Sequence, residues 1–320
     1  MQNLIPSSQE ILEARSRINP YIHRTPVITS SLINRRIGNE LFFKCENFQK
    51  AGAFKSRGAV NAILCLTPFQ RKHGVATHSS GNHAQALARA ARLFNIPAYV
   101  VMPSNAPQVK IAAVKDYGGL ITFCEPTLEA RESTLKQVIA KTGANEIHPY
   151  DNYTVIAGQA TAAAELFEQA PLLDYLLCPV GGGGLLSGTA LSCAYFSSKT
   201  KVIACEPVGA DDAFRSFSSG KIVPSLHPKT IADGLLTSLG GRNFPIILKY
   251  VSEVVTVSEE AIVEAMRLLY ERAKIVVEPS SAVPLAALLE NKISAKNSKI
   301  GIILSGGNVD LANLPFYNKL

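Results

Sequence analysis

Apolar residues recur along the chain in two alternating patterns. Short continuous apolar runs of the kind that form buried strands occur at 41–46, 96–103, 174–180 and 299–307. Between such runs, apolar positions repeat every three or four residues, as at Val60, Ile63 and Leu64, which predicts helices. Strands that alternate with helices predict an α/β fold built on parallel-rich sheets flanked by helices.

The order of these elements predicts two lobes. Strand and helix patterns follow one another closely between residues 74 and 148, as in a small parallel α/β unit. We therefore expect a small domain at 74–150 and a large domain formed by 1–73 and 151–320. Ligands gather at the C-terminal ends of parallel strands, so we expect the active site between the two lobes.

Composition narrows the class of protein. Of the 320 residues, 47% are hydrophobic and 18% are charged, which is typical of a soluble globular protein. The net charge of +7 includes no block of consecutive basic residues, so we expect no nucleic-acid partner. No apolar run is long enough to span a membrane, and Glu10 and Glu13 lie where a signal peptide needs an apolar core. Six cysteines without metal-ligand spacing predict buried, reduced thiols, and we expect a cytoplasmic protein.

The strongest local motif is CPVGGGGLLSG. A buried strand runs into Gly181, Gly182, Gly183 and Gly184, and a helix follows. Because glycine has no Cβ, successive backbone N–H groups can turn inward at the helix N-terminus and bind a phosphate. No Gly-Lys-Ser/Thr closes the loop, and the third glycine of a dinucleotide motif is missing, so neither nucleotide hydrolysis nor NAD chemistry is supported.

Three further motifs carry candidate chemistry. In THSSGNHAQA, a strand end precedes a helix start made of Ser79, Ser80, Gly81, Asn82 and His83. Such a turn suits a carboxylate, or its polar residues simply cap the helix. In ILSGGNVD a strand delivers Ser305 to a glycine turn, and in QKAGAFKSRGAV Lys55 follows Phe54 among small residues. A lysine in such surroundings suits an amine that forms an imine.

Four motifs occur in this order and near these spacings: GAFKSRGA, SSGNH, GGGG and SGGN. With them the chain resembles the fold type II pyridoxal-phosphate (PLP) enzymes. That is a two-lobed fold of the tryptophan synthase β type, with the cofactor between the lobes. Within it, the chain is similar to the serine racemase and serine/threonine dehydratase group, and to the racemases most. The resemblance extends over nearly the whole chain, including VIAGQAT, TIADGL and ILSGGNVD.

The resemblance implies a role for each motif residue. Lys55 would be the Schiff-base lysine and the acid/base on one face of the cofactor, and Ser80 the acid/base on the opposite face. The implied cofactor contacts are Phe54, Lys55, Asn82, Gly181, Gly182, Gly183, Gly184 and Ser305. The substrate carboxylate would be surrounded by Ser79, Ser80, Gly81, Asn82 and His83.

The implied activity has two products. After loss of the α-proton, L-serine or L-threonine can lose its β-hydroxyl and give a 2-oxo acid and ammonia. Reprotonation by Ser80 would instead give the D-amino acid. A neutral hydroxyl at Ser305 protonates a pyridine nitrogen poorly, so we expect elimination to compete well. Tyr150 stands where animal racemases carry asparagine, which leaves open a 3-hydroxyaspartate ammonia-lyase or a catabolic threonine dehydratase without racemisation.

The resemblance also implies a homodimer, a divalent cation and a nucleotide effector. Glu206, Ala210 and Asp212 match the Mg²⁺ ligands of the racemase group, with Ca²⁺ or Mn²⁺ as alternatives, although the residues alone also fit a solvated acidic loop. Animal racemases bind ATP at a subunit interface. The partial matches to that site are Lys50, Gln85, Lys110, Tyr117 and Asn308. Ala51 stands where that site has a threonine.

Other classes fit the chain less well. Cysteine-forming PLP synthases share the fold but usually carry a Gly-Thr-Gly-Gly phosphate loop, which is absent here. A non-catalytic amino-acid sensor on the same scaffold would lose Lys55. An NAD-dependent dehydrogenase would need a ribose-binding context that the glycine run lacks.

Overall fold

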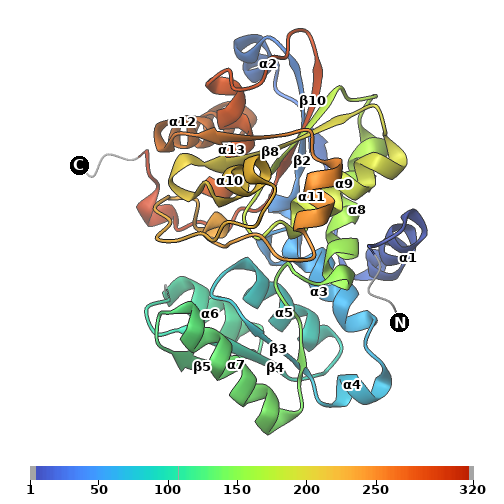
Figure 1. Cartoon of the computed structure of the whole chain (residues 1–320), viewed down its shortest axis with the longest axis vertical. Coiled ribbons are helices and arrows are strands. Elements are labelled where there is room, and N and C mark those ends of the chain that lie inside the picture. The colour runs from blue at the N-terminus through green and yellow to red at the C-terminus, as the bar shows by residue number, and fades with distance from the viewer. Residues whose placement is uncertain (1–4, 107, 317–320) are drawn as a thin grey trace.

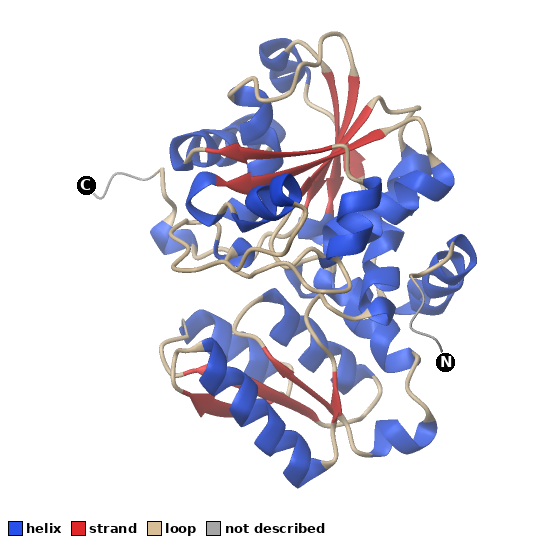
Figure 2. Cartoon of the chain, in the orientation of Figure 1, coloured by secondary structure: helices blue, strands red, loops and turns tan. Residues whose placement is uncertain are grey.

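The computed structural model describes residues 5–106 and 108–316. It shows two α/β lobes, one above the other in Figure 1, each with a sheet flanked by helices (Figure 2). The predicted α/β class is therefore confirmed. Among the described residues, no helix combines the length and the apolar character that crossing a membrane requires.

The large lobe contains a sheet of six strands. Their order is β1 (Val27–Ile28), β2 (Glu40–Cys45), β10 (Lys299–Leu304), β7 (Tyr175–Pro179), β8 (Lys201–Pro207) and β9 (Glu253–Val257). β1 runs antiparallel to its neighbour, and the other pairs are parallel. The C-terminal ends of β2, β10, β7 and β8 therefore meet at one edge of the sheet, which faces the other lobe.

Helices cover both faces of this sheet. They are α1 (Ser8–Ile18), α2 (Ser31–Ile37), α8 (Tyr153–Gln169), α9 (Gly184–Phe196), α10 (Asp212–Ser219), α11 (Phe244–Tyr250), α12 (Glu259–Leu268) and α13 (Pro279–Leu289). α8 and α9 approach closely because Gly188 has no side chain: a Cβ there would lie 2.6 Å from the backbone nitrogen of Ala160. Apolar side chains of α12 and α13 join those of the sheet in one continuous core.

The small lobe contains a parallel sheet of four strands. Their order is β5 (Leu120–Cys124), β4 (Ala98–Pro103), β3 (Val75–His78) and β6 (Asn145–Glu146). The helices of this lobe are α4 (Pro68–Lys72), α5 (Asn82–Leu93), α6 (Gln108–Asp116) and α7 (Leu128–Thr142).

One helix, α3 (Lys55–Leu64), packs against both lobes. Its Gly58 N–H donates to Gln159 Oε1 of α8 at 3.1 Å. Its Val60 and Ile63 belong to the same core cluster as Val75 of β3. The residue that begins this helix, Lys55, is therefore held where the two lobes meet.

Local signals set the ends of two helices. α8 begins at Tyr153, because the Asn152 side chain accepts from the N–H groups of Thr154 and Val155 and caps the helix. α12 ends as an α-helix at Leu268, and the chain continues in a π-helical turn over Leu269–Ala273. The expectation of six buried thiols is wrong for Cys65, which is exposed, and for Cys124, which is partly exposed.

Candidate active site

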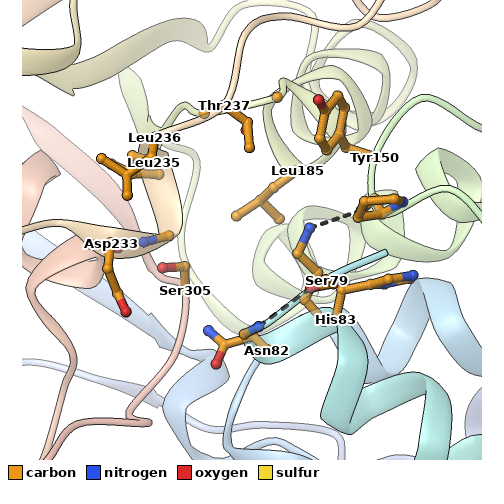
Figure 3. A pocket seen from close by; sticks show the side chains of 18 of the residues that line it. Ser79, Asn82, His83, Tyr150, Leu185, Asp233, Leu235, Leu236, Thr237 and Ser305 are labelled. Carbon is orange, nitrogen blue, oxygen red and sulfur yellow. Dashed lines mark hydrogen bonds between the residues drawn. The ribbon is translucent and has the colours of Figure 1, made fainter. Parts of the chain in front are cut away.

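A cavity of about 420 Å³ lies between the lobes (Figure 3). It is lined by all the residues that the sequence assigns to catalysis, cofactor and substrate: Phe54, Lys55, Ser79, Ser80, Gly81, Asn82, His83, Gly181, Gly182, Gly183, Gly184 and Ser305. In Figure 3, Asn82 lies opposite Tyr150 and Thr237 across this space. Residues far apart in the sequence thus share one concave site, as ligand-binding residues do.

Lys55 extends its amine into the cavity from the start of α3. The Nζ atom donates a hydrogen bond of 2.8 Å to the carbonyl oxygen of Pro149. Burial disfavours the ammonium form and lowers the pKa of Lys55 to about 8, while the negative charge of Glu278 opposes the shift. At neutral pH this amine can both gain and lose a proton, as a covalent acid/base lysine must.

The glycine loop joins the end of β7 to the start of α9. Gly183, with φ of +91°, precedes the first helical residue, so the loop needs a backbone conformation that favours glycine. A Cβ on Gly182 would lie 2.4 Å from the ring of Tyr150, so the loop and this ring form one closely packed wall. The Gly182 carbonyl accepts from Gly240 N and Asn243 Nδ2, both at 3.1 Å, and these bonds hold the glycine loop in place.

The SSGNH turn lies at the N-terminus of α5. The Gly81 N–H donates weakly to Ser79 Oγ at 3.4 Å, and Asn82 begins the helix. His83 is buried, and its Nε2 lies 3.1 Å from the carbonyl oxygen of Ile147, so Nε2 carries the proton. Burial holds the pKa of His83 well below its usual value, which favours the neutral form of this imidazole.

A carboxylate that the motifs did not indicate, Glu278, also lines the cavity. It immediately precedes α13 and is buried. Asn82 Nδ2 donates to both its oxygens, at 2.8 and 3.0 Å, and Asn82 Oδ1 accepts from Asn308 Nδ2 at 2.9 Å. Burial raises the pKa of Glu278 to about 7, so the site contains a second group that titrates near neutral pH.

Tyr150 forms part of the cavity wall. Its ring makes an edge contact with His148 at a centroid distance of 4.6 Å. Burial raises the pKa of its phenol, and a hydrogen bond with Thr237 opposes the shift. The phenol therefore stays protonated at neutral pH and can donate.

Ser305 follows β10 and is buried at the cavity wall. Its carbonyl oxygen accepts the N–H of Phe54 at 3.0 Å, which ties it to the segment that carries Lys55. Its side chain offers a neutral hydroxyl to anything bound in the cavity.

A buried ion network lies behind Lys55. Arg57, two residues further along α3, donates to both oxygens of Glu46 and both oxygens of Glu165 at 2.7–2.8 Å. Lys44 donates to Glu165 as well, at 2.7 Å. The network contains two positive and two negative side chains, so it has no net charge. It joins β2, α3 and α8.

The predicted cation residues lie together but outside the cavity. Glu206 is buried and accepts the N–H groups of Ala213 and Phe214, so it does not belong to a solvated loop. Asp212 Oδ2 is buried and has no hydrogen-bond partner among the described residues. Burial raises the pKa of Glu206 to about 8 and that of Asp212 to about 6. Ala210 is buried as well, and one of the two buried carboxyl groups has an orphaned oxygen, a hard ligand of the kind that a divalent cation prefers.

The five predicted nucleotide residues come from both lobes of the structure. Lys110 lines the active-site cavity and pairs with Asp233 of the opposite lobe. Asn308 donates to the carbonyl oxygen of Ala51 at 2.8 Å, and Gln85 is buried in α5. The remaining two are Lys50, in the turn before Ala53, and Tyr117, which packs against the small-lobe core.

Comparison with known proteins agrees with this geometry. The chain is 51% identical to the β-hydroxyaspartate dehydratase of Paracoccus denitrificans, over 98% of this chain and 99% of that protein. It is 52% identical to the serine racemase of Dictyostelium discoideum, over 96% of each. A solved threonine deaminase from T.th. superimposes with a TM-score of 0.92, at 44% identity over 96% of this chain and 100% of that one. A family model described as pyridoxal-phosphate dependent enzyme matches residues 18–306, and the chain belongs to that family.

Proposed function

We propose that the chain is a PLP-dependent serine/threonine ammonia-lyase with serine racemase activity. It would convert L-serine or L-threonine to a 2-oxo acid and ammonia, and interconvert L- and D-serine. The observation that carries the proposal is the single cavity shared by Lys55, Ser80 and the glycine loop. The similarity to a serine racemase and a threonine deaminase supports the same activity.

The cavity residues fit the cofactor. The glycine loop, which has no room for a Cβ at Gly182, would hold the phosphate at the N-terminus of α9. Lys55 would hold the cofactor covalently, Phe54 would pack against it and Ser305 would contact the ring nitrogen. When bound, the cofactor supplies an electron sink for the negative charge left at the substrate Cα.

The protein residues would handle the carboxylate and the protons. The turn from Ser79 to His83 presents hydroxyls and a helix N-terminus to the substrate carboxylate. Lys55, with a pKa lowered to about 8, would accept the α-proton. Ser80 would serve the opposite face, and its hydroxyl would return a proton there to give D-serine. Departure of the β-hydroxyl is the competing outcome.

The test is to incubate the purified enzyme with L-serine, D-serine, L-threonine and 3-hydroxyaspartate, and to assay keto acid and chirality together. We expect keto acid from L-serine and L-threonine, and D-serine from L-serine. Absence of both products with the first three substrates would overturn the proposal.

A specific observation favours 3-hydroxyaspartate as a second candidate substrate. Arg131 of α7 lines the cavity, and its Nε donates to the Thr127 carbonyl. None of the salt bridges within the described part of the chain includes Arg131, so its charge can pair with a second carboxylate of a substrate. A named relative, the β-hydroxyaspartate dehydratase, acts on such a compound.

This second candidate is tested with Arg131→Met. If Arg131 binds a β-carboxylate, the kcat/KM for 3-hydroxyaspartate should fall on the order of a hundredfold while that for L-serine changes little. Arg92→Met is the matched control, since Arg92 donates to the Asp116 carbonyl away from the cavity. Equal losses with both substrates would contradict the candidate.

We further propose that Glu206, Ala210 and Asp212 bind Mg²⁺, or Ca²⁺ or Mn²⁺, as structural support for the large lobe. The buried orphan oxygen of Asp212 supports this proposal. A cytoplasmic homodimer and activation by ATP remain proposals that follow from the resemblance. Lys110 pairs with Asp233 in this structure, so a nucleotide bound through Lys110 would share that ammonium group with Asp233 or displace it.

A further inference from the structure

Ser281, a residue outside every motif, contacts the side chain of Ser305. It lies in the first turn of α13 and is fully buried. Its Oγ lies 3.1 Å from Ser305 Oγ, 2.6 Å from the Gly306 carbonyl oxygen and 2.7 Å from the Gly306 nitrogen. One hydroxyl thus makes three hydrogen bonds to two consecutive residues.

The protons of these bonds can be assigned from chemistry. The Gly306 carbonyl oxygen can only accept, and at 2.6 Å it takes the single proton of Ser281. The Gly306 N–H donates to one lone pair of Ser281 Oγ. The remaining lone pair can therefore only accept, so in the contact between the two hydroxyls Ser305 is the donor.

The backbone around Ser305 is fixed from several sides. Phe54 N–H donates to the Ser305 carbonyl, and Glu278 N–H donates to the Gly306 carbonyl, both at 3.0 Å. A Cβ on Gly306 would lie 2.8 Å from Glu278 Oε1 and 3.0 Å from Ala53 Cβ. The Ser305 hydroxyl can still rotate on this fixed backbone, and Ser281 controls that rotation.

We propose that Ser281 is a positioning residue, which holds the oxygen of Ser305 in place for the pyridine nitrogen of the cofactor. Because Ser281 cannot donate to Ser305, the Ser305 proton has two acceptors: Ser281 or the ring nitrogen. Ser281 therefore holds the Ser305 oxygen by accepting its proton and competes with the ring nitrogen for that proton, which keeps Ser305 a weak donor to the ring. The inference rests on the proposed placement of that nitrogen at Ser305.

The experiment compares holoenzymes carrying Ser281→Ala, Ser305→Ala and both substitutions. Two quantities are measured: the visible absorbance spectrum as a function of pH, and the dissociation constant of PLP obtained by dialysis. We expect Ser281→Ala, which frees the Ser305 proton for the ring nitrogen, to lower that constant by up to roughly tenfold, equivalent to one hydrogen bond, and to shift the spectrum in the direction opposite to Ser305→Ala. In the Ser305→Ala background, Ser281→Ala should add no further spectral change.

Ser192→Ala is the matched control. Ser192 is also a fully buried helix serine, and its hydroxyl donates to the Ala160 carbonyl at 2.7 Å, remote from the cavity. It should lower the melting temperature about as much as Ser281→Ala while leaving the spectrum and PLP affinity unchanged. Circular dichroism establishes that each variant is folded.

Each outcome decides the question. If Ser305→Ala alters the spectrum and Ser281→Ala does not, the role of Ser281 is wrong and the proposed placement stands. If the spectral changes of Ser281→Ala and Ser305→Ala add up in the double variant, Ser281 does not act through Ser305 and the inference fails. If neither substitution changes the spectrum or the affinity, the placement of the ring nitrogen at Ser305 is itself overturned, and the inference with it.

Discussion

The amine of Lys55 donates to the carbonyl oxygen of Pro149 at 2.8 Å, across the boundary between the lobes. The next residue along the chain, Tyr150, packs its ring on Gly182 of the glycine loop. The lysine that would bind the cofactor and the loop that would bind its phosphate are thus connected through two adjacent residues. The hydrogen-bond partner of the amine is thus a neutral carbonyl oxygen, which is consistent with the lowered pKa of Lys55.

Capture of PLP by the apoenzyme should depend on the ionisation of Lys55. Only the unprotonated amine attacks an aldehyde, so the rate should rise with pH and level off above the Lys55 pKa of about 8. Glu278→Gln removes the negative charge that raises the pKa of Lys55, so it should move the midpoint to lower pH. Stopped-flow absorbance measures the pH midpoint of PLP capture for the unsubstituted enzyme and for Glu278→Gln. A midpoint near 10.5, the pKa of an ordinary lysine, would show that burial does not lower the pKa of Lys55.

Substitution of Ser80 should separate the two activities. Ser80→Ala removes the hydroxyl that would return a proton to the opposite face, and leaves Lys55 to remove the α-proton. Formation of D-serine should fall by at least about a hundredfold, in the range of general acid–base catalysis, while pyruvate formation from L-serine largely persists. Chiral chromatography and a keto acid assay on the same samples measure both. Equal losses would mean that Ser80 binds substrate rather than transferring a proton.

Divalent cations should stabilise the large lobe through Glu206 and Asp212. At a Mg²⁺ concentration about a hundredfold above its dissociation constant, stability should increase by about 2.7 kcal/mol, seen as a higher melting temperature that EDTA reverses. Asp212→Asn should abolish the increase. Asp211→Asn is the control, because Asp211 is partly exposed and pairs with Arg215. A shift that survives Asp212→Asn would place the cation elsewhere.

The ion network behind Lys55 should be sensitive to loss of one member. Arg57→Met leaves Glu46 and Glu165 buried without their main partner, and should lower the free energy of unfolding by about 3–5 kcal/mol. Arg36→Met breaks an exposed pair with Glu264 and should cost less than about 1 kcal/mol. Urea unfolding of both variants tests this. Similar losses of unfolding free energy in Arg57→Met and Arg36→Met would show that burial of the network does not increase its contribution to stability.

The predicted site residues that line the cavity lie mostly in local motifs in which a turn follows a strand. The glycine loop, the SSGNH turn and Ser305 each follow an apolar strand directly, so their position at the sheet edge can be predicted from the pattern alone. Their meeting in one cavity follows from the parallel arrangement of those strands.

The residues that sequence missed act through partners far away in the chain. Asn82 and Glu278 are separated by 196 positions, and no local pattern connects them. Pro279 and Pro284 obscure the helix that carries Ser281 and follows Glu278, because proline usually interrupts a helical pattern. Pro279 instead occupies the first turn, where a missing N–H costs nothing. The packing of Tyr150 on Gly182 joins residues 32 positions apart and needs the folded chain.

The most direct test of the account is reduction of the purified enzyme with borohydride, followed by peptide mapping. The untreated protein should show a visible absorbance band that reduction abolishes, and the mass of the reduced cofactor should be found on the peptide that contains Lys55. Lys55→Ala should carry no such adduct. A protein that remains colourless with added PLP, or an adduct on a different lysine, would contradict the assignment of this cavity as the active site.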